Sequence, residues 1–154
     1  LHELELVLDN LDVDVIEIMF NIIHQEVTNR FEEIKKRGIL LVIKVPLDSG
    51  WLTGKYNKDS SFSGIRARWN QDSKNIRSSI VDKIKEITKQ DNVVQTALSF
   101  ITSFDAVTTV IPGVKSESQL MKNIEAANTV MDNTIKDQLV ALYNKEIKYQ
   151  NTPW

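Results

Sequence analysis

One stretch, residues 106–123, constrains the fold of this chain more than any other. Its first part, AVTTVI, is rich in β-branched residues and predicts a strand that stops at Pro112 and Gly113. A helix is then predicted to begin at Ser116, because Ser116 and Gln119 have the spacing of a capping box. The stretch therefore predicts a strand that turns through a glycine directly into a capped helix.

The mouth of this helix allows two interpretations. A helix N-terminus carries free N–H groups and partial positive charge, and Lys115 lies beside it, so the turn is suited to bind a phosphate. An ordinary strand-to-helix turn with a solvated lysine has the same features. Geometry alone leaves both interpretations open.

Two further apolar segments, residues 13–20 and 39–45, predict buried strands. The second is almost continuously apolar, which is typical of a parallel sheet covered on both faces. Helices are predicted at residues 1–10, at residues 28–36 with Thr28 as the cap and Gly38 at the end, from Ile76, after Asp91 and Asn92, from Ser116, and from Asn133 or Thr134.

Alternating strands and helices predict βαβ units with right-handed crossovers. Residues 46–56 form a loop with two glycines. Residues 57–75 are polar and poorly periodic, and a loop of that length suggests a functional lid or binding loop. The tail from Tyr149 onward is expected to be loose. Three strands cannot close a (β/α)₈ barrel, which needs eight.

Composition limits the function. A chain of 154 residues is roughly one domain, and a net charge of −2 without a basic block gives no sign of nucleic-acid binding. With no cysteine there is no disulfide and no thiolate site, which fits a cytoplasmic location. No apolar run approaches the roughly 20 residues of a membrane span. No histidine or acidic cluster has metal-ligand spacing, and no G-x-S-x-G elbow is present. The chain opens at Leu1 rather than Met, so we expect it to be part of something longer.

Three segments together resemble one family. Residues 13–21 resemble a barrel strand that ends in Asn. Residues 46–56, PLDSGWLTGKY, resemble the pattern PL-x-x-G-x-LTGKY, and residues 111–123 resemble IPG-x-[KR]-S-x-x-Q-x-x-x-N. In order and spacing they are similar to the C-terminal portion of an aldo-keto reductase, a TIM-barrel oxidoreductase that uses NADPH. The resemblance implies an α/β fold in which residues 1–154 form strands six to eight of a partial (β/α)₈ barrel with extra helices.

The resemblance also implies cofactor-binding residues. Residues of the first loop are matched to the pyrophosphate and nicotinamide-ribose part of NADP(H): Pro46, Leu47, Gly50 and Leu52. Residues at the mouth of the later helix are matched to the 2′-phosphate: Gly113, Lys115 and Ser116. Gln119 and Asn123 are matched to the adenine end. Glu17 stands where the family often has a Gln that contacts the carboxamide.

Besides Glu17, two further features depart from the family pattern. Lys44 stands where the family usually has an aromatic ring that stacks on the nicotinamide. Trp51 could supply a ring instead, although we expect it to be a residue of the site mouth or lid. The family's catalytic Tyr, Lys, Asp and His come from an N-terminal half that is absent here, so the chain supplies no catalytic residue. We expect His24 to be an exposed loop histidine near the substrate mouth.

Two functional hypotheses follow. The first is the cofactor-binding half of an NADPH-dependent aldehyde or ketone reductase, inactive without its N-terminal half. The second is a non-catalytic half-barrel that serves in oligomerisation or nucleotide binding. Both give the chain exposed sheet edges, so we expect a homo-oligomer or association with the missing half.

Overall fold

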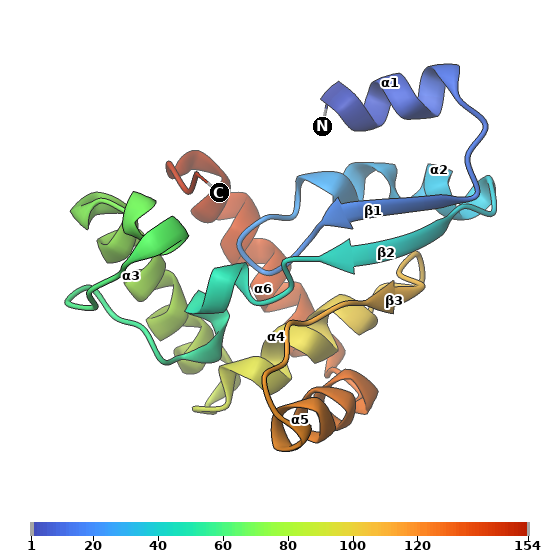
Figure 1. Ribbon diagram of the computed structural model, residues 1–154. Coiled ribbons are helices and arrows are strands. Elements are labelled where there is room, and N and C mark those ends of the chain that lie inside the picture. Colours follow the sequence, from blue (N-terminus) through green and yellow to red (C-terminus); the bar gives the residue numbers. More distant parts are fainter. Residues whose placement is uncertain (1, 154) are drawn as a thin grey trace.

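Three parallel strands form the centre of the fold. The computed structural model describes residues 2–153, apart from the side chain of Ile65. β1 (Val15–Met19), β2 (Leu40–Lys44) and β3 (Thr109–Val110) pair in the order β1-β2-β3 (Figure 1). Both pairings are parallel, so the carboxyl ends of the strands meet at one edge of the sheet.

Helices alternate with these strands, as the sequence predicts. The α-helices are α1 (His2–Asn10), α2 (Phe31–Lys36), α3 (Gln71–Thr88), α4 (Val93–Thr102), α5 (Glu117–Asn128) and α6 (Asn133–Lys145). Short 3₁₀ segments are η1 (Glu26–Arg30), η2 (Asp48–Thr53), η3 (Gly64–Arg68) and η4 (Ile147–Tyr149). α2 packs against β2 and α4 against β3, while α5 lies on α4 and α3 lies beside α6. The arrangement is an α/β fold that corresponds to part of a (β/α)₈ barrel.

Several predicted element ends are confirmed. α1 ends at Asn10 as expected, although Leu1 lies outside the described residues. Gly38 follows α2 with a φ of 72°, the left-handed conformation that ends a helix and favours glycine. The third strand is much shorter than predicted, because β3 pairs only with β2 at one side of the sheet.

Three predicted helix starts are wrong. Thr28 does not cap α2, because it lies inside η1, where its hydroxyl donates to the Gln25 carbonyl at 2.7 Å. α3 begins at Gln71 rather than Ile76, since Asn70 accepts a hydrogen bond from the Ser73 N–H at 2.8 Å. Asp132, rather than the two residues after it, caps α6. In each case several polar residues in a row could form the cap, and apolar spacing does not distinguish them.

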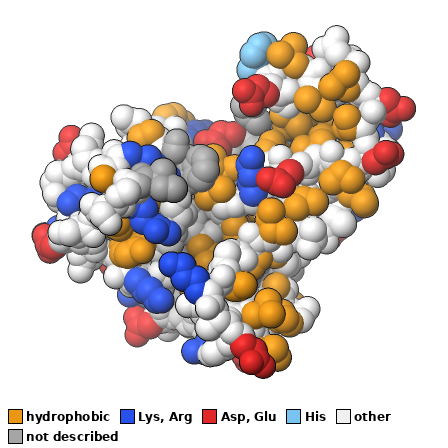
Figure 2. Space-filling view, viewed as in Figure 1, with side chains coloured by type: hydrophobic (Ala, Val, Ile, Leu, Met, Phe, Trp, Pro, Cys, Tyr) orange, Lys and Arg blue, Asp and Glu red, His pale blue; other side chains and the backbone are white. Residues whose placement is uncertain are grey.

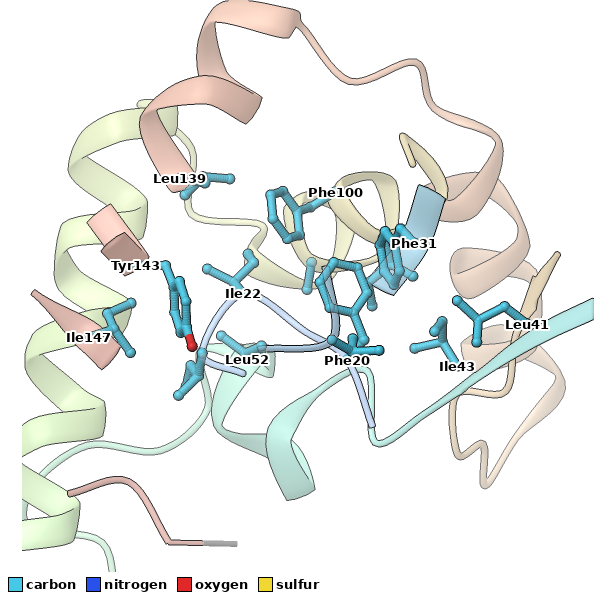
Figure 3. Close-up of a cluster of buried hydrophobic side chains, with 14 of the residues drawn as sticks. Phe20, Ile22, Phe31, Leu41, Ile43, Leu52, Phe100, Leu139, Tyr143 and Ile147 are labelled. Carbon is cyan, nitrogen blue, oxygen red and sulfur yellow. The ribbon is translucent and has the colours of Figure 1, made fainter. Parts of the chain in front are cut away.

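Four phenylalanine rings hold the sheet and helices together. Phe20, directly after β1, is fully buried, with ring centroids 5.1 Å from Phe31 and 5.8 Å from Phe100 (Figure 3). The ring centroid of Phe104 lies 5.2 Å from that of Phe20. Two of the three contacts are edge-to-face, a geometry that adds stability beyond the buried area. Because the other rings come from α2, α4 and the turn after α4, Phe20 joins segments that are far apart in sequence.

Within residues 2–153, one face of the sheet has no helix over it. Ile16 and Leu41 point to the helical side and are buried, whereas their neighbours Val15 and Leu40 are 51% and 49% exposed. Figure 2 shows hydrophobic side chains gathered over the strands on this face. A parallel sheet is normally covered on both faces, and the uncovered side corresponds to the interior of a complete barrel. We call this surface the open sheet face.

The Phe20 cluster should dominate the stability of the chain. Phe20→Ala is expected to lower the free energy of unfolding by about 3–5 kcal/mol, because it leaves a cavity among three other rings. Urea titration followed by circular dichroism measures the change. Val130→Ala is the control, since Val130 is 92% exposed and should change stability by less than about 0.5 kcal/mol. Equal effects of the two substitutions would contradict the assigned role of Phe20.

Candidate cofactor-binding site

The loop that follows β2 has an unusual backbone. Val45, Asp48 and Ser49 have φ values of 54°, 43° and 55°, and Gly50 has 106°. Positive φ is uncommon for residues other than glycine and is a genuine outlier for a β-branched residue such as Val45. Such strain clusters at ligand-binding sites, where the surrounding structure holds it in place. We call residues 45–52 the cofactor loop.

Backbone and amide hydrogen bonds fix the shape of this loop. Asn21 donates its side-chain N–H to the Val45 carbonyl at 2.9 Å, which ties the end of β1 to the end of β2. The Gly50 N–H donates to the Leu47 carbonyl at 2.8 Å. A Cβ at Gly50 would lie 2.9 Å from a ring carbon of Tyr56. Glycine is therefore required at position 50 for both its backbone conformation and its lack of a side chain.

A fully buried ion pair lies beneath the cofactor loop. Asp48 and Arg77 are both 0% exposed, and the Arg77 Nε donates to Asp48 Oδ2 at 2.8 Å. His24 Nε2 lies 3.5 Å from Asp48 Oδ1, longer than a good hydrogen bond. Burial raises the pKa of Asp48, but His24 and Arg77 outweigh it, so this pKa lies below its usual 3.8. Asp48 is therefore ionised at neutral pH.

This network corrects two sequence-based expectations. His24 is buried rather than exposed, because it turns inward towards Asp48. The tail after Tyr149 is also held, since Arg77 Nη2 donates to the Pro153 carbonyl at 2.7 Å, although Trp154 lies outside the described residues. Periodicity did not indicate either contact, because both join residues that are distant in sequence.

A cavity of about 570 Å³ lies between the cofactor loop, the start of α4 and α5. Its lining comprises Leu47, Thr53, Lys55, Asn92, Val94, Gln95, Gly113, Gln119, Lys122, Asn123, Glu125 and Ala126. Four of these residues, Leu47, Gly113, Gln119 and Asn123, are among those predicted to bind the cofactor. The structure thus brings together two segments that the sequence separates by more than sixty positions.

The first turn of α5 has the predicted cap with one variation. Ser116 Oγ accepts from the Gln119 N–H at 3.3 Å, as in a capping box. The Gln119 side chain accepts instead from the Lys115 N–H at 2.9 Å, one residue before the cap. Gln119 therefore fixes the turn that leads from Gly113 into the helix, at the edge of the cavity.

Asn123 is the polar group of the cavity best placed to recognise a ligand. It is only 7% exposed, and its side-chain amide has no hydrogen-bond partner among residues 2–153. The amide lines the open cavity, so it is available to a ligand with matching donors and acceptors. An amide can both donate and accept, as the edge of a purine requires.

Two lysines in the cavity lining were not among the cofactor-binding residues predicted from the sequence. Lys55 and Lys122 lie on opposite sides of the cavity, one after η2 and the other on α5. Neither forms an ion pair with another residue in the described part of the chain. Figure 2 shows lysine and arginine side chains gathered between α3 and α5. Lys122 could have been found from its spacing, because it lies one helical turn after Gln119.

The remaining predicted residues lie outside this lining. Lys115 and Ser116 are exposed at the mouth of α5. Pro46, Gly50 and Leu52 belong to the cofactor loop, and the Leu52 side chain is fully buried. Glu17 lies on the open sheet face, with its carboxylate 3.7 Å from the Lys44 ammonium. The structure thus places Glu17 and Lys44 together, away from the cavity.

Aromatic side chains pack behind the cofactor loop. Trp51 is 0% exposed, and its ring centroid lies 5.8 Å from Tyr56, 5.6 Å from Phe62 and 5.7 Å from Trp69. The expectation that Trp51 forms a mouth or lid is therefore wrong, because its ring fills the interior between η2 and the following loop. That loop is shorter than predicted and contains η3.

No helix in the described part of the chain is both long and apolar enough to cross a bilayer.

The pH dependence of stability should report the buried Asp48. Because its pKa is lowered by folding, its contribution is complete above pH 3.8 and is lost as the pH falls below that value. Urea midpoints of the wild type and Asp48→Asn should therefore differ most at neutral pH, and the difference should shrink progressively as the pH falls below 3.8. A difference that stays constant from pH 7 to 3 would contradict an ionised Asp48.

Comparisons with known proteins agree with this geometry. A family model described as aldo/keto reductase family matches residues 3–144. A comparison with curated proteins gives no match. Among solved structures, the chain is similar to an aldo-keto reductase, AKR11C1, from Bacillus halodurans in its holo form, with 18% identity and a TM-score of 0.71 over 98% of this chain and 50% of that one.

A second similar structure is the glycerol dehydrogenase AKR11B4 from Gluconobacter oxydans, with 13% identity, a TM-score of 0.76, and coverage of 99% of this chain and 49% of that one. The chain therefore spans about half the length of these structures. At such identities the structural likeness supports the fold alone, whereas the family model covers most of the sequence. The chain belongs to the aldo/keto reductase family.

Proposed function

We propose that this chain is the cofactor-binding, C-terminal half of an NADPH-dependent aldo-keto reductase that reduces aldehydes or ketones by hydride transfer. The observation that carries the proposal is the cavity between the cofactor loop and α5, which unites residues from two separate motifs of the family resemblance. Pockets at the carboxyl ends of barrel strands are where such enzymes bind their ligands.

The adenosine end of the cofactor fits the α5 side of the cavity. The unpartnered amide of Asn123 matches an adenine edge, which offers both a donor and an acceptor. Gly113, Lys115 and Ser116 surround the start of α5, where free N–H groups favour a phosphate. Lys55 and Lys122 add positive charge to the lining, and Glu125 opposes them. Two lysines against one carboxylate still leave a net positive lining for the 2′-phosphate.

The cofactor loop would contact the other half of the cofactor, its pyrophosphate and nicotinamide ribose. Pro46, Leu47 and Gly50 lie at the carboxyl end of β2, in a loop whose positive-φ residues include Val45 and Asp48. A fixed backbone can approach a pyrophosphate closely without losing entropy on binding. When bound, the nicotinamide supplies the hydride. In this proposal Glu17 faces the carboxamide, and its ion pair with Lys44 holds it on the open sheet face.

Carbonyl reduction also needs a proton donor and a substrate pocket. No residue of this chain matches the family's catalytic tyrosine, lysine, aspartate or histidine, so these groups would come from the other half of the barrel. The chain alone is then a nucleotide-binding unit without turnover. We further propose that it acts in the cytoplasm.

A second candidate function is a non-catalytic half-barrel that binds a partner. The open sheet face favours it, because Val15 and Leu40 are about half exposed on a parallel sheet. The partner would be a second copy of this chain or the missing half of the barrel.

Cofactor titration tests the first proposal. Lys115→Glu should weaken NADPH more than NADH, because only NADPH carries the 2′-phosphate. A close charge contact in a partly wet site is worth about 1–3 kcal/mol, or roughly 5–150-fold in affinity. Fluorescence titration of the 154-residue chain with both cofactors measures the difference. Lys36→Glu, on the distant α2, changes net charge equally and should affect neither. Equal weakening of the binding of both cofactors by Lys115→Glu would contradict the assignment of Lys115 to the 2′-phosphate site.

Light scattering tests the second proposal. The wild type should associate at low micromolar concentration. The double variant Val15→Lys/Leu40→Lys should shift the protein towards monomer, because burying two unpaired charges in an apolar contact costs free energy. Val130→Lys is the matched control, since it adds a charge at an exposed valine away from the sheet. A cooperatively folded wild-type monomer would exclude this face as an association surface.

A further inference from the structure

We propose that Arg77 is the positioning residue of the cofactor loop and that it acts on the loop through Asp48. The inference deepens the proposed function, because it names what holds one half of that site in shape. Arg77 lies on α3 and Asp48 lies inside the loop, and both side chains are 0% exposed. Their 2.8 Å contact is the single buried ion pair between the loop and a helix in the described part of the chain.

The loop needs such a contact because its backbone is unfavourable. Asp48 and Ser49 have φ values of 43° and 55°, and the adjacent Gly50 has 106°. Backbone in this region persists only where neighbouring contacts over-determine it. The ion pair pulls the Asp48 side chain inward, and Arg66 donates to the Ser49 carbonyl at 3.0 Å from the outer side. The buried contact fixes the strained residue itself.

Arg77 also joins the loop to the end of the chain. Its Nε donates to Asp48, and its Nη2 donates to the Pro153 carbonyl at 2.7 Å. A guanidinium can bind two acceptors at once because its donors form a rigid planar fork, whereas a lysine ammonium lacks that geometry. The guanidinium also lies 5.6 Å from the centroid of the Trp69 ring. Loop, tail and aromatic cluster are therefore held by one side chain.

The Asp48–Arg77 ion pair also determines the charge that the cofactor loop presents to a ligand. A carboxylate turned outward at position 48 would repel the pyrophosphate of a nucleotide cofactor. Arg77 keeps the Asp48 carboxylate buried and neutralised, so the loop presents backbone groups to the cavity instead of a negative charge. Removing Arg77 alone would leave a buried charge without its partner, which destabilises the whole chain. The informative variant therefore removes both charges.

The double variant Arg77→Met/Asp48→Asn tests the inference without requiring a ligand. Amide hydrogen exchange should accelerate at least about tenfold at Gly50 and Leu52, whose N–H groups donate to the Leu47 carbonyl. Exchange at Leu40, which donates to the Asp14 carbonyl at 2.8 Å, should change less than about twofold. Arg77→Lys, which keeps the charge, should fall between wild type and the double variant at Gly50.

Ligand binding gives the functional readout. Affinity for NADP⁺ should fall about tenfold in the double variant, whereas affinity for adenosine 2′,5′-bisphosphate, which does not reach the loop, should change less than about twofold. Lys83→Met is the matched control, because it breaks an exposed ion pair of the same helix with Glu146. This control should alter neither the exchange at Gly50 nor either affinity.

The possible outcomes distinguish a failure of the Arg77 inference from a failure of the proposed function. Unchanged exchange at Gly50 and Leu52, or equal acceleration at Leu40, would overturn the positioning role of Arg77. Equal losses of affinity for both ligands would also overturn it, since the effect would then be global. If the wild type binds neither ligand, the proposed function is wrong, and hydrogen exchange still decides whether Arg77 positions the loop.

Discussion

Parallel pairing of the three strands is the constraint on which the rest of the structure depends. Parallel neighbours need a crossover between them, so each strand is followed by helices that return the chain to the same starting edge. The carboxyl ends of all three strands therefore lie at the opposite edge of the sheet. The loops that begin at Val45 and Ile111 meet there, although nearly half of the sequence separates them. The cavity is a direct result of this topology, whereas its chemistry depends on a few loop residues.

The sequence was informative where physical signals are local. The apolar segments predicted all three strands, Gly38 marked the end of α2, and Ser116 marked the start of α5. Each of these features depends on residues within about four positions of one another. The lining residues Gly113, Gln119 and Asn123 were found through a family motif, in which Gly113 precedes α5 and the other two lie on it.

Other features depend on contacts that a single sequence does not encode locally. The Asp48–Arg77 pair spans 29 positions, and the burial of His24 follows from it. Asp48 could be read as an ordinary turn residue, since aspartate is common in turns. Lys122 was overlooked for a different reason, because an exposed lysine on a helix usually faces solvent. Its spacing from Gln119 was the one local signal that placed it near the cavity lining.

The aromatic cluster behind the cofactor loop gives the chain a built-in optical signal. Trp51 and Trp69 are buried there, with ring centroids 5.7 Å apart, and the guanidinium of Arg77 lies near Trp69. These are two of the three tryptophans in the sequence, and neither belongs to the lining of the cavity. Indole emission depends on the polarity and charge around the ring. The emission of these two tryptophans is thus a local spectroscopic signal from this one loop.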